Sequence, residues 1–376
     1  MMKATGREAG ILPVQAIRGL IEAGQVKLAQ PPLANQLQPA SLDLRLGGQA
    51  FRVRASFLPG SDTVAAKLRD LHLHTIDLSK SAVLETGCVY IVPLLESMAL
   101  PPELAAATNP KSSTGRLDIL TRLIADEATR FDQVEEGYEG QLYLEVAPRS
   151  FSVVVRTGTR LNQLRFRRTR GENPKPITVA DWRALLMEGQ IADSTAMTEK
   201  TGNLPFTIDL KGSGSEDALI GWRAKKHTRR IDLEFRSYDP FDFWEPIRFR
   251  KDSSLILDPD EFYILMTKEA IAVPPEFAAE MLPYDTRAGE FRVHYAGFFD
   301  PGFGWDARTR RAGSSRGVLE VRSHEVPFLL EHGQTIGWLR YERMAERPDM
   351  LYGNDIASNY QGQQLKLAKQ FRPLAT

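Results

Sequence analysis

The segment NPKSSTGRL carries a cluster of groups suited to binding a phosphate. It brings Lys111, the hydroxyls of Ser112 and Ser113, a glycine and Arg116 into one short loop. Backbone N–H groups, hydroxyls and a guanidinium can all donate hydrogen bonds to phosphate oxygens. An ordinary turn is the competing interpretation, because serine and glycine turns with a nearby arginine are common. The loop is therefore a candidate phosphate site that needs support from elsewhere in the chain.

Two strand-like segments each carry a glutamate suited to general base catalysis. In QLYLEVA the apolar and polar residues alternate, so Glu145 shares the face opposite the predicted core, and VLEVRS presents Glu320 in the same way. A carboxylate that projects from a rigid strand into a cleft has a raised pKa and can accept a proton. A solvated strand face is the commoner explanation. A glutamate at both places favours the functional interpretation, although inheritance by duplication would also produce it.

The segment AGFFDPGFG, residues 296–304, predicts a tight turn just before the second of these strands. The matching part of the first half has Glu135 and Glu136 in place of Asp-Pro. Conversely, the second half has LPYDTRAGEF where the first has its serine loop, and Asp285 there would repel a phosphate. Each half thus keeps a different part of a site. We expect one working site to combine loop 111–116 with turn 296–304.

An internal repeat indicates the elements that must position these residues. The segments 84–106 and 257–279 are identical at ten of 23 positions, at an offset of 257 − 84 = 173, where chance would give roughly one or two. Upstream, residues 13–26 and 178–191 both predict a helix, with Pro13 as a first helical residue in one copy and a Thr178/Asp181 cap in the other. Short alternating segments between turns follow in each copy, which predicts a mainly β fold of two barrels or sandwiches.

The repeat also predicts the domain boundaries. We expect a first domain over residues 1–168 that carries the serine loop, and a second over 177–376 that carries the Asp-Pro-Gly turn. The polar segment TRGENPKP, residues 169–176, is the predicted linker.

Composition narrows the classes of function. The chain has 376 residues, with 48 Lys and Arg against 48 Asp and Glu, which argues against a nucleic-acid-coating surface. No apolar run approaches a membrane span and the first residues lack a signal-peptide core, so we expect a cytoplasmic protein with no membrane partner. The single cysteine, Cys88, excludes an internal disulfide and multi-cysteine metal sites. His72 and His74 suggest an exposed strand more than a metal pair. The arginine-rich insertion 304–317 suggests either an anion lid or a solvated hairpin tip.

Taken together and in order, several motifs resemble the dCTP deaminase family of the dUTPase-like superfamily, in its longer, duplicated form. They are QPASLDLRLG, KSSTGR, AGFFDPGF, a strand ending in LEV, GQTIGWLRY and a C-terminal Tyr…Tyr-x-x-Gln tail. The resemblance implies a tandem pair of distorted β-barrels, each with an N-terminal helix. It also implies assembly into homo-oligomers, with a trimer favoured, and conversion of dCTP to dUTP and ammonia in pyrimidine deoxynucleotide metabolism.

The resemblance implies roles for individual residues. Ser112, Ser113 and Arg116, with Lys111 where the family usually has arginine, would contact the triphosphate or position the base and the attacking water. The glutamate of the LEV strand would be the general base. We favour Glu320, with Ala296 and Asp300 on the pyrimidine side, and keep Glu145 as the alternative. The tail residues that match the family are Tyr352, Tyr360 and Gln363. The usual lysine before the second tyrosine is Asn359 here, so Lys366 or Lys369 would have to replace it.

The implied chemistry needs no catalytic metal. Zinc-dependent deaminases carry HxE and PCxxC motifs, and neither occurs in this sequence. In the resembled family a glutamate takes a proton from water, and Mg²⁺ is expected only on the triphosphate. Two alternatives stay open. One is dUTP pyrophosphatase activity or a bifunctional conversion of dCTP to dUMP. The other is a nucleotide sensor without catalysis.

Overall fold

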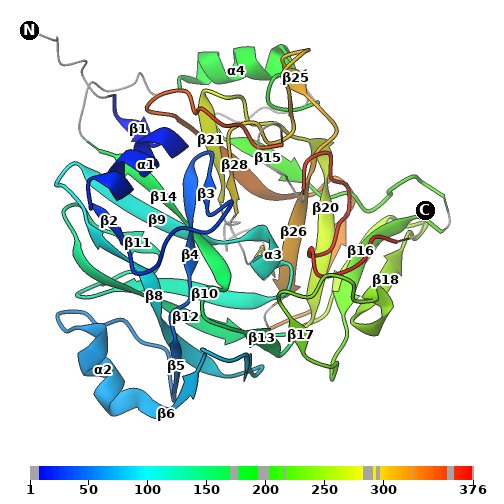
Figure 1. The fold of residues 1–376 in the computed structure, drawn as a ribbon. Coiled ribbons are helices and arrows are strands. Elements are labelled where there is room, and N and C mark those ends of the chain that lie inside the picture. Colours follow the sequence, from blue (N-terminus) through cyan, green and yellow to red (C-terminus); the bar gives the residue numbers. More distant parts are fainter. Residues whose placement is uncertain are drawn as a thin grey trace, which may run out of the picture.

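A computed structural model describes residues 8–169, 177–193, 203–215, 217–282, 291–293, 297–323, 325–353 and 360–374. The fold is mainly β, as the turn-punctuated pattern predicts (Figure 1). The elements of the first half are β1 (Gly10–Ile11), α1 (Val14–Glu22), β2 (Val26–Leu28), β3 (Leu37–Gln38), β4 (Ser41–Arg45), β5 (Gln49–Val53), α2 (Val64–Leu71), β6 (His72–Asp77), β7 (Ala82–Leu84), β8 (Val89–Ala99), β9 (Leu104–Pro110), α3 (Ser112–Gly115), β10 (Ile119–Ala125), β11 (Gln133–Val134), β12 (Glu139–Pro148), β13 (Val153–Val155) and β14 (Arg160–Arg168).

The second half likewise begins with a helix that is followed by strands. Its elements are α4 (Val179–Met187), β15 (Leu204–Thr207), β16 (Leu219–Ala224), β17 (Ile231–Asp232), a 3₁₀ turn (Pro240–Asp242), β18 (Trp244–Arg248), β19 (Ser254–Leu257), β20 (Phe262–Ala270), β21 (Phe277–Leu282), β22 (Phe291–Val293), β23 (Phe298–Phe299), β24 (Trp305–Asp306), β25 (Arg311–Ala312), β26 (Arg316–Ser323), β27 (Phe328–Glu331) and β28 (Thr335–Arg343).

The strand pairings of the two halves correspond. In the first half β14 lies between β4 and β9, and β12 lies between β8 and β10. In the second half β28 lies between β15 and β21, and β26 lies between β20 and β22. The antiparallel pairs β7 with β13 and β19 with β27 also correspond. The segments that the sequence repeat aligns therefore have the same neighbours in both halves.

Both predicted helices form. In α4, the Thr178 side chain accepts from the Asp181 N–H and the Asp181 carboxylate accepts from the Thr178 N–H, so the predicted cap is present. In α1 the prediction is off by one residue. Pro13 has an extended ψ of 169° and is the N-cap rather than the first helical residue, because the chain arrives from strand β1. No helix among the described residues is long and apolar enough to cross a membrane.

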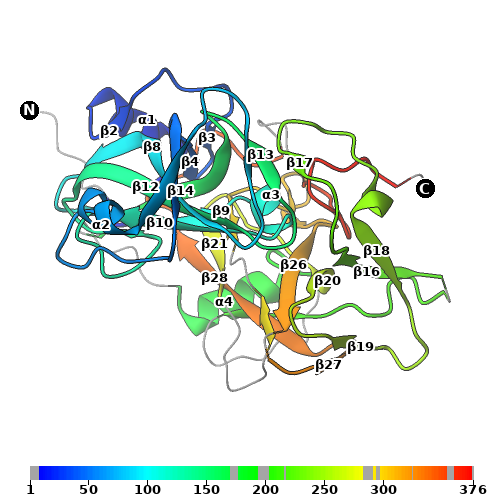
Figure 2. The ribbon, with the colours of Figure 1, turned by 90° about the horizontal axis from the view of Figure 1, so that it is seen from below.

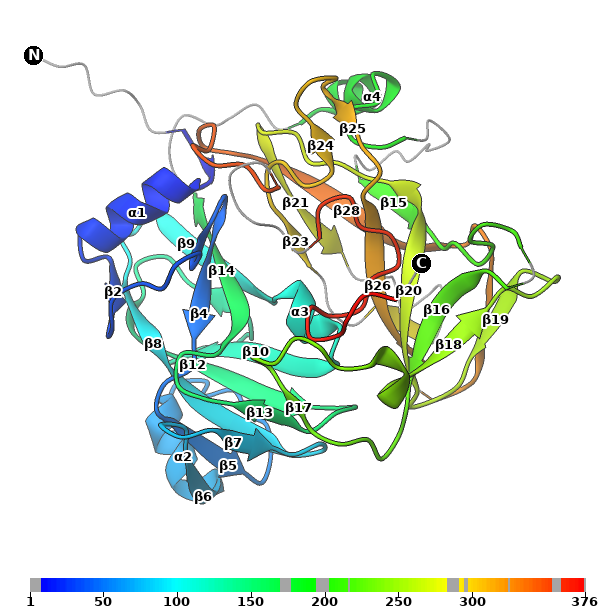
Figure 3. The ribbon, with the colours of Figure 1, turned by 45° about the vertical axis from the view of Figure 1, so that its right-hand side comes forward.

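The two halves pack closely against each other. Strand β17 of the second half adds to β13 of the first in parallel (Figure 2). Strand β26 presents alternate residues to the two sides: Leu319 and Val321 belong to the core of the second half, whereas Val318 joins a core cluster shared with the first. Arg322, on the same face as Val318, forms a buried ion pair with Asp118 of the first half. Helix α3 lies where the halves meet (Figure 3).

Candidate active site

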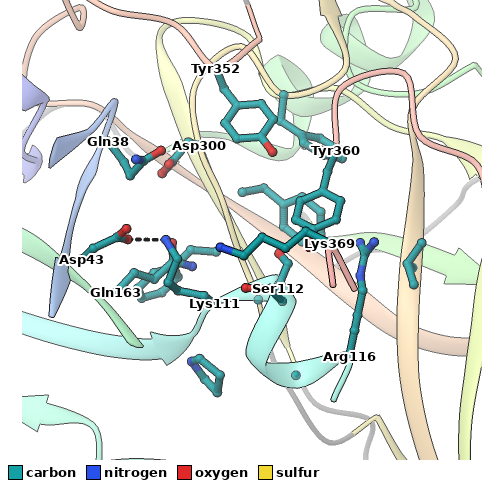
Figure 4. A pocket seen from close by; sticks show the side chains of 18 of the residues that line it. Gln38, Asp43, Lys111, Ser112, Arg116, Gln163, Asp300, Tyr352, Tyr360 and Lys369 are labelled. Carbon is teal, nitrogen blue, oxygen red and sulfur yellow. Dashed lines mark hydrogen bonds and ion pairs between the residues drawn. The ribbon is translucent and has the colours of Figure 1, made fainter. Parts of the chain in front are cut away.

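A cavity of about 290 Å³ opens between the two halves. Figure 4 shows side chains from α3, from strands of both halves and from the C-terminal segment converging on it. Its walls are formed by Asn35, Gln38, Asp43, Pro110, Lys111, Ser112, Ser113, Gly115, Arg116, Arg160, Gln163, Arg236, Met281, Gly297, Phe298, Phe299, Asp300, Phe303, Val318, Glu320, Tyr352, Tyr360, Gln363 and Lys369. The cavity therefore joins loop 111–116 of the first half to the Asp-Pro-Gly turn of the second.

Loop 111–116 folds into the single turn α3 and is fastened to strand β14. The Lys111 N–H and the Thr114 hydroxyl both donate to the Leu161 carbonyl, at 2.8 Å each. The Thr114 and Gly115 N–H groups turn back to the Lys111 carbonyl. The Lys111 ammonium forms an ion pair with the buried Asp43 carboxylate (Figure 4). These bonds fix the loop so that Ser112 and Ser113 line the cavity.

Arg116 connects the loop to the C-terminal segment and to Glu320. Its guanidinium is buried and donates to the Gln363 side-chain oxygen at 2.8 Å and to the Lys366 carbonyl at 2.9 Å. It stacks 4.1 Å from the centre of the Tyr360 ring. Its Nε lies 3.8 Å from Glu320 Oε1, on the side of the guanidinium that makes no hydrogen bond.

Glu320 is the buried carboxylate at the wall formed by β26. Only 5% of the residue is exposed, and burial raises its pKa to about 8, although the charge of Arg116 acts in the opposite direction. Desolvation prevails because the buried carboxylate loses its water, while the cation of Arg116 lies 3.8 Å away and a backbone hydrogen bond compensates only in part. The carboxyl group of Glu320 therefore gains and loses its proton close to physiological pH, which suits proton transfer.

Glu145 does not reach the cavity. It lies opposite Arg122 on β10, and its Oε1 accepts two hydrogen bonds from that guanidinium, at 2.6 and 2.8 Å. Arg122 also packs 3.9 Å from the centre of the Phe131 ring and donates to Ser56. The expectation of a solvated strand face is wrong here, because Glu145 is 1% exposed. The cation that pairs with Glu145 is Arg122 of the same half, whereas the cation beside Glu320 is Arg116 of the other half.

Asp300 lines the cavity beside several aromatic residues. Burial raises its pKa, and the charge of Arg165, whose Nη2 lies 3.1 Å away, acts in the opposite direction. Arg165 is itself held by the Ala279 carbonyl at 3.0 Å and stacks on Phe298. Phe299, Phe303 and Tyr352 form a chain of ring contacts on the same wall. Ala296, the other residue expected on this side, lies outside the described residues.

One end of the cavity is rich in cations that the motif analysis did not single out. Arg160 lies 3.3 Å from Asp43, and Arg236 reaches the same wall from the second half. Of the two tail lysines considered, Lys369 lines the cavity, whereas Lys366 is exposed, lies over the Tyr360 ring and is not part of the lining. Burial and the neighbouring cations lower the pKa of Lys369 to about 8. Asp43 lies within the motif QPASLDLRLG, which was the available signal for this end of the site.

The remaining candidates have separate positions. Tyr352, Tyr360 and Gln363 all line the cavity, as expected for the tail. The insertion 304–317 forms the hairpin β24–β25, whose arginines 308, 310 and 311 are exposed and outside the lining, and Arg316 pairs with Asp209 at 3.1 Å. In this structure the insertion is therefore a hairpin with an exposed, arginine-rich tip. His72 and His74 are exposed on β6. Among the described residues there is no cluster of three or more His, Cys, Asp or Glu suited to a metal.

Comparison with known proteins identifies the family. Residues 8–170 match the 2'-deoxycytidine 5'-triphosphate deaminase N-terminal domain, and residues 178–371 match the C-terminal domain. The chain belongs to the 2'-deoxycytidine 5'-triphosphate deaminase family. The family resemblance predicted from the motifs is confirmed, and with it the prediction that the protein is an enzyme.

Solved and curated members of the deaminase family show the extent of the likeness. A crystal structure of a 2'-deoxycytidine 5'-triphosphate deaminase from Agrobacterium tumefaciens is 52% identical, with a TM-score of 0.84, over 91% of this chain and 99% of that one. A dCTP deaminase of Halorubrum lacusprofundi is 31% identical over 147 residues, 38% of this chain and 70% of that protein. A dUMP-forming dCTP deaminase of Methanosphaera stadtmanae is 25% identical over 169 residues, 44% of this chain and 83% of that protein.

Proposed function

We propose that this chain catalyses the hydrolytic deamination of dCTP to dUTP and ammonia, with Glu320 as the general base. The observation that carries the assignment of the base is the position of the two glutamates. Glu320 lines a cavity together with the serine loop and Arg116, whereas Glu145 is bound to Arg122 in its own sheet. The names of the related deaminases support the substrate.

In the proposed reaction, ionised Glu320 takes a proton from a water molecule that the Ser112 hydroxyl helps to hold. The water oxygen bonds to C4 of cytosine, and the proton passes through Glu320 to N3. The second proton of the water goes to the amino group, the C4–N bond breaks, and ammonia leaves with its bonding electrons. The balance is dCTP plus water giving dUTP plus ammonia. Arg116 lies beside Glu320, and its charge favours the ionised form that begins the reaction.

We assign the cation-rich end of the cavity to the triphosphate. Lys111, Arg160, Arg236 and Lys369 supply positive charge there, and the α3 loop supplies hydroxyls and N–H groups. In this proposal Mg²⁺ enters as part of the substrate on the phosphate oxygens, and Asp43 is the carboxylate on that wall. No catalytic metal takes part. The opposite end, with Asp300 and the aromatic wall, receives the pyrimidine.

A second activity is considered because some relatives are named dUMP-forming. In that case the same cavity would also direct a water molecule to the α-phosphate of dUTP, releasing pyrophosphate. The products separate the candidates. The test is to incubate the protein with dCTP and Mg²⁺ and to resolve the nucleotides by anion exchange, with a zinc-chelator control. Chelator-insensitive dUTP supports the deaminase, dUMP with pyrophosphate supports the bifunctional enzyme, and unchanged dCTP that is bound supports a sensor.

The proposal extends to architecture and setting. The corresponding pairings around β12 and β26, together with the sequence repeat, support two copies of one dUTPase-like barrel over 1–168 and 177–376. We propose a homo-oligomer, with a trimer favoured, which light scattering of the purified protein tests. We also propose a cytoplasmic location, which fractionation of cells that express the protein tests.

A further inference from the structure

The C-terminal segment 360–374 lies along the cavity and then leaves it. Figure 3 shows this segment in red beside α3. Its first part is fastened to the second half through Gln363, whose side chain donates to the Arg316 carbonyl at 2.8 Å, and through Gln364, whose side chain donates to the Ser314 carbonyl at 2.8 Å. The carbonyl of Lys366 accepts from Arg116 of the first half. Gln363 and Lys366 thus bring the segment to the loop that binds phosphate in the proposed function.

Lys369 is the lysine of this segment that enters the cavity. Figure 4 shows its side chain extending toward Lys111 and Ser112. Burial lowers the pKa of Lys369, and so do the neighbouring cations Lys111, Arg236 and Arg160. These positive charges repel one another when the cavity holds no anion. A bound triphosphate would replace that repulsion with attraction to its negative oxygens.

The residues that flank Lys369 are locked in place. Ala368 and Gln370 are buried, and the Gln370 side chain donates to the Leu233 carbonyl at 2.9 Å. Phe371 is buried among aromatic rings, 5.5 Å from Phe243 and 6.0 Å from Trp244 between ring centres. Phe151 of the first half packs on both of those rings.

Two backbone hydrogen bonds also hold the chain that follows Lys369. The Tyr238 N–H donates to the Gln370 carbonyl, and the Arg372 N–H donates to the Tyr238 carbonyl, at 3.0 Å each. Arg372 also forms an ion pair with Asp239. The chain on the carboxyl side of Lys369 is therefore held by a fixed part of the second half.

We propose that Lys369 is the cation of the C-terminal segment that binds the substrate's triphosphate, and that Phe371 is the positioning residue that holds it there. The inference rests on the proposed function, since it takes a nucleoside triphosphate as the substrate. The proposal predicts that the packing of Phe371 on Phe243 and Trp244 affects substrate affinity and not the chemical step.

The first test compares steady-state kinetics with dCTP and Mg²⁺ for the wild type, Lys369→Met, Lys366→Met and Lys80→Met. Lys80 is an exposed lysine outside the cavity lining and serves as the charge-matched control. Loss of one charge-assisted contact should raise KM for Lys369→Met by about tenfold to a hundredfold, with a much smaller change in kcat. Binding of deoxycytidine, which has no phosphate, should be unchanged. A wild-type KM for Lys369→Met, or a larger loss for Lys366→Met, would overturn the proposal.

The second test concerns Phe371. Phe371→Ala should raise KM to the same extent as Lys369→Met, and the double variant should be no worse than Lys369→Met alone, because both changes remove one contact. Phe371→Leu, which keeps an apolar side chain, should recover most of the affinity and replaces the alanine variant if that protein does not fold. Independent, multiplying effects in the double variant would refute the positioning role. A wild type that neither binds nor turns over dCTP would instead refute the proposed function itself.

Discussion

Glu320→Gln should abolish turnover and, at the same time, make the protein more stable at neutral and alkaline pH. The side chain is 5% exposed and its pKa is raised from 4.5 to about 8 by burial. Glutamine has nearly the same shape as the protonated glutamate and never ionises. The substitution therefore removes the proton acceptor of the proposed reaction together with the desolvation penalty that raises its pKa.

The magnitude follows from the linkage between proton binding and folding. Between pH 4.5 and 8 the native protein holds a proton on Glu320 that the unfolded chain has lost, so the free energy of unfolding falls as pH rises through this window. At about 1.36 kcal/mol for each pH unit, wild type loses at most about 5 kcal/mol at this site. The variant should exceed wild type by about 1 kcal/mol at pH 5, about 3 kcal/mol at pH 6.5 and close to 5 kcal/mol at pH 8.5.

The assay is urea unfolding followed by tryptophan fluorescence at those three pH values, with dCTP binding and turnover measured on the same samples. We expect bound dCTP, turnover reduced by a factor of about 10² to 10⁴ or more, and a stability difference that grows with pH. A difference that stays constant or reverses at high pH would refute the argument that burial, and not a specific contact, sets the properties of Glu320. Glu145→Gln is the matched control, because Glu145 is equally buried but already bound to Arg122.

Further predictions follow from the same contacts. Glu145→Gln should keep most of the activity while lowering the urea midpoint at pH 7, since Arg122 loses its charged partner; loss of turnover with a normal melting profile would move the site to the first half. Ser112→Ala should lower kcat through poorer positioning of water, with KM for dCTP changed less, and equal losses in both would contradict this role. Arg116→Ala should raise KM and lower kcat, because the guanidinium contacts both the C-terminal segment and Glu320. The plot of kcat/KM against pH should rise toward pH 8 as Glu320 ionises and fall above it as Lys369 loses its proton, and Lys369→Met should lose the alkaline limb.

The sequence by itself determined the family and the parts of the site that lie in contiguous motifs. Serine loop 111–116, Asp300 and the tail residues could be identified because each depends on local residue types: hydroxyls and cations in a turn, Asp-Pro-Gly, and spaced tyrosines. The helix caps and the alternation in the glutamate strands are likewise local, since periodicity follows from backbone geometry. The repeat also led to the expectation that one site takes parts from both halves.

Only the tertiary structure shows that Glu320 lines the cavity and Glu145 does not, and only it brings the rest of the cavity wall together. Glu145 and Glu320 have equivalent strand positions. Only the packing shows that Arg122 forms an ion pair with Glu145, and that Arg116 of the first half lies beside Glu320. Likewise Asp43, Arg160, Arg236 and Lys369 are distant in sequence and meet at one wall only after the halves pack. The physical reason is that charge and burial depend on which side chains converge in space, and no local pattern encodes that convergence.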